Sequence, residues 1–181
     1  MCRVAALADA RTAGTGALVE TCPNCILFES DEVERFGERA NFVPPLRSAA
    51  DRVELWRGLI DGRVDTVASN HCVYHIDEKE PEMVSFRDDV FGAPGLETLV
   101  PLMGDHALNG PISFERLFSL LAESPARIFG IPQKGCIALR LDADLLVIDP
   151  NDMTMVHGQS STEPPTTRSS MVDIYVAQSI T

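Results

Sequence analysis

The order of three segments at the start of the chain most constrains its fold. Residues 17–19 form a short apolar run, residues 48–60 carry a helical pattern, and residues 64–68 form a second apolar run. Ser48, with an acidic residue three positions later, is typical of a helix N-terminus, and Gly62 directly past the end is the usual stop. Strand, helix and strand in this order are typical of a βαβ unit with parallel strands. We therefore expect an α/β fold.

The helical segment also shows which of its faces should be buried. Its apolar residues fall at positions three and four apart, which places them on one side of a helix. They are Val53, Leu55, Trp56, Leu59 and Ile60. We predict that Leu55, Trp56 and Leu59 pack across the two strands.

Three further helices are predicted outside this unit. Residues 3–13 carry an apolar face and stop at Gly14. Residues 113–121 form a second helical pattern, and residues 124–129 form a third that ends at Gly130.

The sequence changes character from residue 131 onward. Residues 134–149 predict two short strands around a polar turn, in a β-rich region outside the βαβ unit. Residues 157–168 are rich in Ser, Thr and Pro and predict an irregular tail, after which residues 172–176 alternate as one last strand.

Charge excludes several classes of partner. The 181 residues include 27 acidic and 15 basic side chains, for a net charge of −12. Phosphate binding needs a concentrated basic face, so nucleic acids and anionic membranes are not expected partners. The sequence has no apolar run of ~18 residues for a membrane span and no signal-peptide pattern at its start. We expect a cytoplasmic protein of one or two domains, with most of its five cysteines reduced and buried.

Asn70 and His71 are the first candidates for a functional site. They follow the second apolar run directly, and residues just past the carboxyl end of a parallel strand face the site in barrels and open sheets. His75 lies four residues after His71, but metal binding at that spacing needs a helix and a third ligand, so we expect a solvated loop histidine. The acidic residues that follow predict a solvated loop rather than a metal cluster.

Cys22 and Cys25 have the C-x-x-C spacing of redox and zinc sites. A zinc site needs two more ligands at matching spacing, and a redox pair needs a helix N-terminus immediately after it. The sequence shows neither, so an ordinary pair of reduced thiols is the favoured interpretation.

Six segments occur in an order that resembles a known family. They are ETCPNCILF, VPPLRSAADRVELWRGLIDGRVDTVASNH, EKE, FGAPGLETLVPLM, ESPARIFGIPQKGCIAL and DADLLVIDP. Over about residues 5–155 the series is similar to the C-terminal part of a cyclic amidohydrolase, in the group of dihydroorotases, hydantoinases (dihydropyrimidinases) and allantoinases. Each motif alone is weak, but their ordered series is specific.

The resemblance implies a fold in two parts. Residues 1–130 would form the C-terminal portion of a (β/α)8 TIM-type barrel, and residues 131–181 would add a segment of a small β-sandwich and an irregular tail. A complete barrel takes ~250 residues, so 181 residues are expected to supply only part of such an enzyme.

The resemblance also implies positions for the site. The family's His-x-His pair, bridging lysine and further histidine ligands would precede this chain, and Asn70 stands where the family has its last metal ligand, an Asp that also shuttles the proton. Substrate-contacting positions fall at His71, Val43, Phe91 and Gly92, with Val43 in place of the family's Asn.

Two further departures from the family also lie in its site motifs. Asn24 stands in place of a histidine common in dihydroorotases, and Cys72-Val73 stands where Cys-Pro or Ala-Pro is usual. Substitutions gathered at site positions, with helices and core segments kept, indicate lost catalysis rather than a lost fold.

The function implied by resemblance is metal-dependent hydrolysis of a C–N bond in a small cyclic amide or ureide. Zinc is expected for the family, whereas this chain is expected to bind none and to be inactive alone. The alternative is a non-catalytic remnant or an associating subunit, and self-association is expected from unpaired strand edges. Dihydroorotate, hydantoin, dihydropyrimidine and allantoin remain equally open as substrates.

Overall fold

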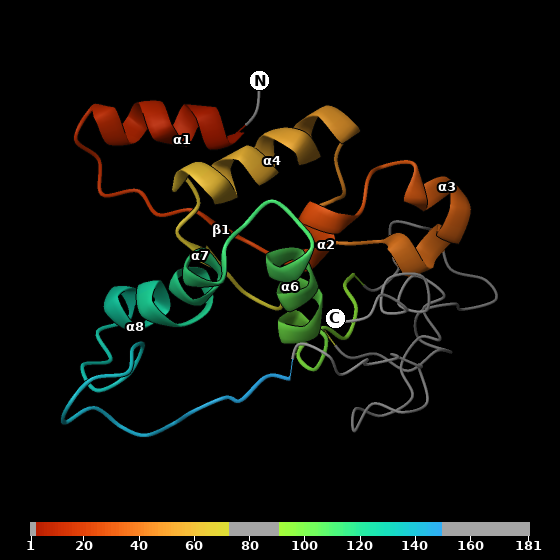
Figure 1. Ribbon diagram of the computed structural model, residues 1–181. Helices are drawn as coiled ribbons and strands as arrows, with labels where there is room; N and C mark the ends of the chain where they lie inside the picture. Colours follow the sequence, from red (N-terminus) through yellow and green to blue (C-terminus); the bar gives the residue numbers. More distant parts are fainter. Residues whose placement is uncertain (1–2, 73–90, 150–181) are drawn as a thin grey trace.

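The computed structural model describes residues 3–72 and 91–149 (Figure 1). At its centre are two short parallel strands, β1 (Glu20–Thr21) and β2 (Thr66–Val67). Glu20 pairs with Thr66, so the predicted parallel arrangement is confirmed, with β1 directly after the first apolar run and β2 within the second. In Figure 1, α1 (Arg3–Thr12) and α4 (Ala49–Asp61) lie above the strands.

Helix α4 has the ends that its sequence predicts. The Ser48 hydroxyl accepts a hydrogen bond from the Asp51 backbone N–H at 3.3 Å, which satisfies one of the donors left open at a helix start. Gly62 ends the helix with φ 85°, a left-handed conformation that glycine adopts without strain.

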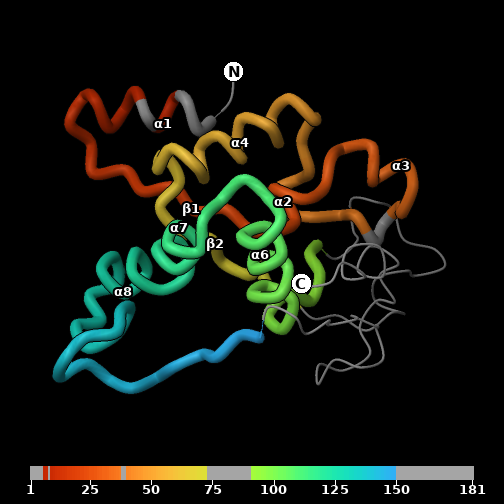
Figure 2. Tube along the Cα trace, viewed as in Figure 1, coloured from red at the N-terminus to blue at the C-terminus, as the bar shows by residue number. Residues whose placement is uncertain are grey.

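The predicted inner face of α4 is confirmed, because Leu55, Trp56 and Leu59 pack into the core, although the helix contacts the segment after β1 more than the two strands. Leu59 is fully buried, and the Trp56 Nε1 donates a hydrogen bond of 2.8 Å to the Ile26 carbonyl of α2 (Pro23–Leu27). Val53 and Ile60 are instead about half exposed, so only part of the apolar set faces inward. The chain thus forms the strand, helix and strand unit expected from its sequence (Figure 2).

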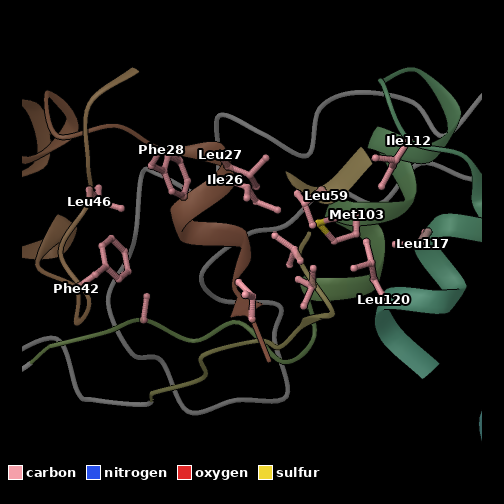
Figure 3. Close-up of a cluster of buried hydrophobic side chains, with 14 of the residues drawn as sticks. Ile26, Leu27, Phe28, Phe42, Leu46, Leu59, Met103, Ile112, Leu117 and Leu120 are labelled. Atoms are coloured by element: carbon pink, nitrogen blue, oxygen red, sulfur yellow. The ribbon is translucent and has the colours of Figure 1, made fainter. Parts of the chain in front are cut away.

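One continuous core joins these elements (Figure 3). Its largest fully buried side chains are Ile26, Leu59, Val64, Met103, Leu117 and Leu120. Arg116 ties the end of α4 to the approach of β2, because its Nε and Nη2 donate to the carbonyls of Leu59 at 2.6 Å and Val64 at 2.5 Å. Burial lowers the pKa of Arg116 from its usual value.

The remaining helices complete the described chain. They are α3 (Glu32–Phe36), η1 (Gly37–Ala40), α6 (Leu99–Leu108), α7 (Phe114–Phe118), η2 (Ser119–Glu123) and α8 (Ser124–Ile128). The last three form one helical run, in which a π-helical turn joins the two helices predicted from the sequence. No helix within the described ranges is long and apolar enough to cross a membrane.

The strands predicted over residues 134–149 are not formed. Residues 134–149 contain neither a helix nor a paired strand. Its apolar side chains lie mostly in solvent, with Ile137 88%, Leu139 95% and Val147 91% exposed. A strand needs a neighbour to complete its backbone hydrogen bonds, and residues 3–72 and 91–149 offer this segment none. The strand predicted at 172–176 lies outside the described residues, and so does His75.

Candidate functional site

Three segments meet at the carboxyl ends of the two strands. The Ala68 N–H donates to the Thr21 carbonyl at 2.9 Å. This hydrogen bond extends the pairing of the two strands one residue past β2. Beyond it, His71 forms a parallel bridge with Ala93, and the Cys72 N–H donates to the Ala93 carbonyl at 3.0 Å. Residues that follow parallel strands therefore share one edge, which is the usual place of a site in such sheets.

A fourth segment joins this edge through Asn41. The Gly92 N–H donates to the Asn41 carbonyl at 2.9 Å, and Asn41 itself is only 5% exposed. This contact places the Asn41 segment beside Gly92, and Val43, two residues further on, is 59% exposed. Phe91 is half-buried next to Gly92. The sequence reasoning missed Asn41, whose only signal is its position two residues before Val43.

His71 is held by the loop that begins at Gly92. Its Nδ1 accepts the backbone N–H groups of Gly95 at 3.2 Å and Leu96 at 3.3 Å. A neutral imidazole whose Nδ1 accepts carries its proton on Nε2. These hydrogen bonds fix the orientation of the ring and occupy the Nδ1 lone pair.

Asn70 lies between His71 and the thiol pair at the end of β1. Its backbone is left-handed, with φ 50°, a conformation that Asn tolerates better than most residues. Its side chain lies close enough to Cys22 to help lower the pKa of that thiol, although Cys22 is 48 positions away in sequence and only 6% exposed. The predicted site residue is therefore directed toward the neighbouring strand end.

The two thiols of the C-x-x-C motif contact each other. Their Sγ atoms are 3.5 Å apart. Hydrogen bonding from the Cys25 thiol lowers the pKa of Cys22 to about 7, against the opposing effect of burial, with smaller contributions from backbone groups and Asn70. The same contact and burial raise the pKa of Cys25. This pair can share a proton in a way that an isolated thiol cannot.

The prediction that no helix begins beside the two cysteines is wrong. The sequence reasoning found no helix N-terminus beside the cysteines, yet Cys22 is the N-cap of α2 and Pro23 is its first residue. Proline suits the first turn of a helix because the N–H that it lacks has no partner there. Both cysteines are free thiols, as expected, and so are Cys72 and Cys136. Of these four only Cys22 is buried, so the expectation that most of the cysteines are buried is wrong.

The donors at this edge do not fit a catalytic metal. Such a site needs about three protein ligands, usually imidazole, thiolate or carboxylate. Asn70 offers a neutral amide, and the Nδ1 of His71 already accepts two backbone N–H groups. Within residues 3–72 and 91–149 no group of three or more His, Cys, Asp or Glu side chains could hold a metal ion.

Two glycines allow the close approach of the loops at this edge. A Cβ at Gly92 would lie 2.6 Å from the Cys72 Cβ, and Gly92 also has a φ of 117°. A Cβ at Gly95 would lie 2.8 Å from the Ser69 carbonyl oxygen. Both positions therefore require glycine if His71 and its loop are to stay together.

Gly92→Ala is expected to lower the free energy of unfolding by about 1 to 3 kcal/mol, because alanine is strained at this φ and collides with Cys72. Gly104→Ala is the matched control. Gly104 lies within α6, where an added Cβ meets nothing within 4 Å, so this change should be neutral or stabilise by up to ~1 kcal/mol. Urea unfolding followed by circular dichroism measures both, and equal effects would contradict the role given to Gly92.

Comparison with known proteins gives a consistent result. No protein-family model matches the sequence. The chain is 39% identical over 150 residues to a dihydroorotase of Halobacterium salinarum, a match covering 83% of this chain and 35% of the relative. It is 38% identical over 143 residues to an L-hydantoinase of Paenarthrobacter aurescens, covering 78% of this chain and 31% of the relative. An allantoinase of Deinococcus radiodurans is 36% identical over 146 residues, a match covering 80% of this chain and 32% of the relative.

Solved structures agree with the sequence matches. The fold superposes on the L-hydantoinase of Arthrobacter aurescens with a TM-score of 0.79 at 36% identity, covering 86% of this chain and 35% of that one. A D-hydantoinase from Thermus gives a TM-score of 0.82 at 28% identity, and the match covers 87% of this chain and 35% of the hydantoinase. The α/β architecture thus fits part of a hydantoinase barrel, and the chain spans about a third of the length of the relatives it matches. By sequence and by fold, it belongs to the cyclic amidohydrolase family.

Proposed function

We propose that this chain supplies the C-terminal part of a barrel that hydrolyses C–N bonds in cyclic amides, and that the chain alone has no such activity. The observation that carries the proposal is the presence of an asparagine, Asn70, at the carboxyl end of β2. It follows β2 at the edge shared by His71, Gly92 and Cys22, where the resemblance implies a catalytic carboxylate.

The chemistry explains why this one residue matters. Opening a cyclic amide requires a base that takes a proton from the attacking water and passes it to the leaving nitrogen. A carboxylate can do both, whereas the amide of Asn70 has no basic oxygen at neutral pH. Family members use a metal, expected to be zinc, to activate the water, and the donors among residues 3–72 and 91–149 do not fit it.

The rest of the edge suits a substrate-binding surface better than a catalytic one. His71 is oriented by Gly95 and Leu96, and Gly92 lets its loop lie directly against the Cys72 side chain. We assign His71, Val43, Phe91 and Gly92 to contacts with a small cyclic amide or ureide. In this assignment residues 1–130 belong to the barrel. Residues 131–181, which form no paired strand up to residue 149, would join the sandwich and tail only in the complete enzyme, a cytoplasmic protein.

The purified 181-residue chain is expected to bind much less than one equivalent of zinc and to open none of four rings: dihydroorotate, hydantoin, dihydrouracil and allantoin. Metal analysis by plasma mass spectrometry and a chromatographic assay of ring opening measure both. A full-length hydantoinase purified alongside serves as the positive control. Stoichiometric zinc together with chelator-sensitive ring opening by the chain alone would overturn the proposal.

A second candidate function is that of a non-catalytic, associating subunit. It is favoured by the exposed apolar side chains of Ile137, Leu139 and Val147 and by the two-stranded sheet, whose outer edges have no further strand within the described residues. Unpaired edges and apolar patches promote association. Light scattering of the purified chain separates the candidates, because a strictly monomeric chain would remove the support for this one.

A further inference from the structure

We propose that Cys22 and Cys25 form a reversible intramolecular disulfide when the protein meets hydrogen peroxide. The inference is independent of the proposed hydrolase function. The observation that carries it is the distance of 3.5 Å between the two Sγ atoms. A disulfide bond is about 2.05 Å long, so the sulfurs must approach by only ~1.5 Å, which small side-chain rotations supply.

The backbone holds the two thiols in this arrangement. Cys22 has an extended conformation, with φ −138° and ψ 160°, directly before the first turn of α2. The Cys25 N–H donates to the Cys22 carbonyl at 3.1 Å, and this closes the turn between them. Trp56 fixes the other end of α2 through the Ile26 carbonyl. The pair is therefore placed by a hydrogen-bonded framework and not by chance contact of two free side chains.

Burial favours a small oxidant and limits competing reactions. Cys22 is 6% exposed and Cys25 is half-buried, so bulky disulfides reach them poorly whereas peroxide is close to water in size. Of the other free thiols described, Cys72 contacts Gly92 in a different loop, and Cys136 is exposed in the segment after α8. Cys25 is thus the nearest partner of Cys22.

The reaction balances with peroxide as the oxidant. One cysteine sulfur attacks the O–O bond, takes one oxygen to become a sulfenic acid, and releases hydroxide, which takes up a proton to become water. The second sulfur attacks the sulfenic sulfur, the S–O bond breaks, and the oxygen leaves as a second water. Two thiols lose two hydrogens, and one peroxide is reduced to two waters. A dithiol reductant reverses the product by thiol–disulfide exchange.

The test uses the full chain with Cys2, Cys72 and Cys136 replaced by Ser, so that only the pair remains. One equivalent of peroxide should remove both thiols from reaction with iodoacetamide. Mass spectrometry should show a loss of two hydrogens and a peptide that links Cys22 to Cys25. Dithiothreitol should restore both thiols. The unsubstituted chain, mapped in the same way, should give the same linkage even if the Ser variant folds poorly.

Two controls separate the folded arrangement from sequence proximity. The disulfide should form at least ~10-fold faster in buffer than in concentrated urea, because the fold holds the sulfurs together. Cys25→Ser in the same background should stop at a sulfenic acid that dimedone traps. The proposal is overturned if the rates in buffer and urea are equal, if both thiols stay open to iodoacetamide, or if Cys22 goes on to sulfinic acid without forming the bond.

Discussion

Asn70→Asp is expected to raise the rate of cyclic-amide hydrolysis by ~100- to 10,000-fold when this chain is combined with a second chain that carries the preceding barrel segments of a hydantoinase. That range is the usual contribution of a positioned proton-transfer group. In the chain by itself the same substitution should produce no activity, because one carboxylate does not supply the ligands that the described residues lack.

The control for this experiment is Asn24→Asp. Asn24 lies in α2, next to the same thiol pair, so this change adds the same charge near the edge without placing a carboxylate at the end of β2. Only Asn70→Asp should restore hydrolysis in the combined chains. Equal rates for the two variants, or an unchanged rate for Asn70→Asp with a partner shown to bind, would contradict the assignment of Asn70.

A second readout of Asn70→Asp needs no partner chain. The Asn70 amide is one of the groups that hold the pKa of Cys22 at about 7. A carboxylate there removes a donor and repels the thiolate, so the pKa of Cys22 should rise. At neutral pH the thiolate fraction falls, and alkylation of Cys22 slows. Its rate against pH, measured by peptide mapping, should move toward higher pH.

The most accurate predictions from the sequence concern local signals. Helix α4 begins and ends within one residue of the predicted bounds, because Ser48 and Gly62 act on the backbone beside them. The break predicted before Ser124 is not observed, since Pro125 lies in the first turn of α8, where its missing N–H is tolerated, and the π-helical turn η2 continues the run.

Contacts between distant segments were harder to predict. The order of segments was enough to place Asn70 and His71 at the edge of a parallel sheet. It could not show that Asn70 meets Cys22, because that contact depends on how two loops pack after their strands. The strands expected over residues 134–149 failed for a related reason: a β pattern forms a strand only when a neighbour accepts and donates its backbone hydrogen bonds.

Leu59→Ala is expected to lower the free energy of unfolding by about 3 to 5 kcal/mol. Leu59 is fully buried in the inward face of α4, and its carbonyl accepts the Arg116 Nε at 2.6 Å. Removing the side chain loses its transfer from water and leaves a cavity, because the close-packed core around it relaxes only in part.

Ile60→Ala, at the next position of α4, is the matched control. The two side chains have the same number of carbons, but Ile60 is 49% exposed and Leu59 is not exposed at all. Ile60→Ala should therefore cost less than about 1 kcal/mol. Urea unfolding followed by circular dichroism should show a large drop in midpoint for Leu59→Ala alone, with the slope unchanged. Similar losses for both variants would mean that α4 does not pack into the core through its Leu59 face, and the parallel unit that brings Asn70 to the edge would lose its support.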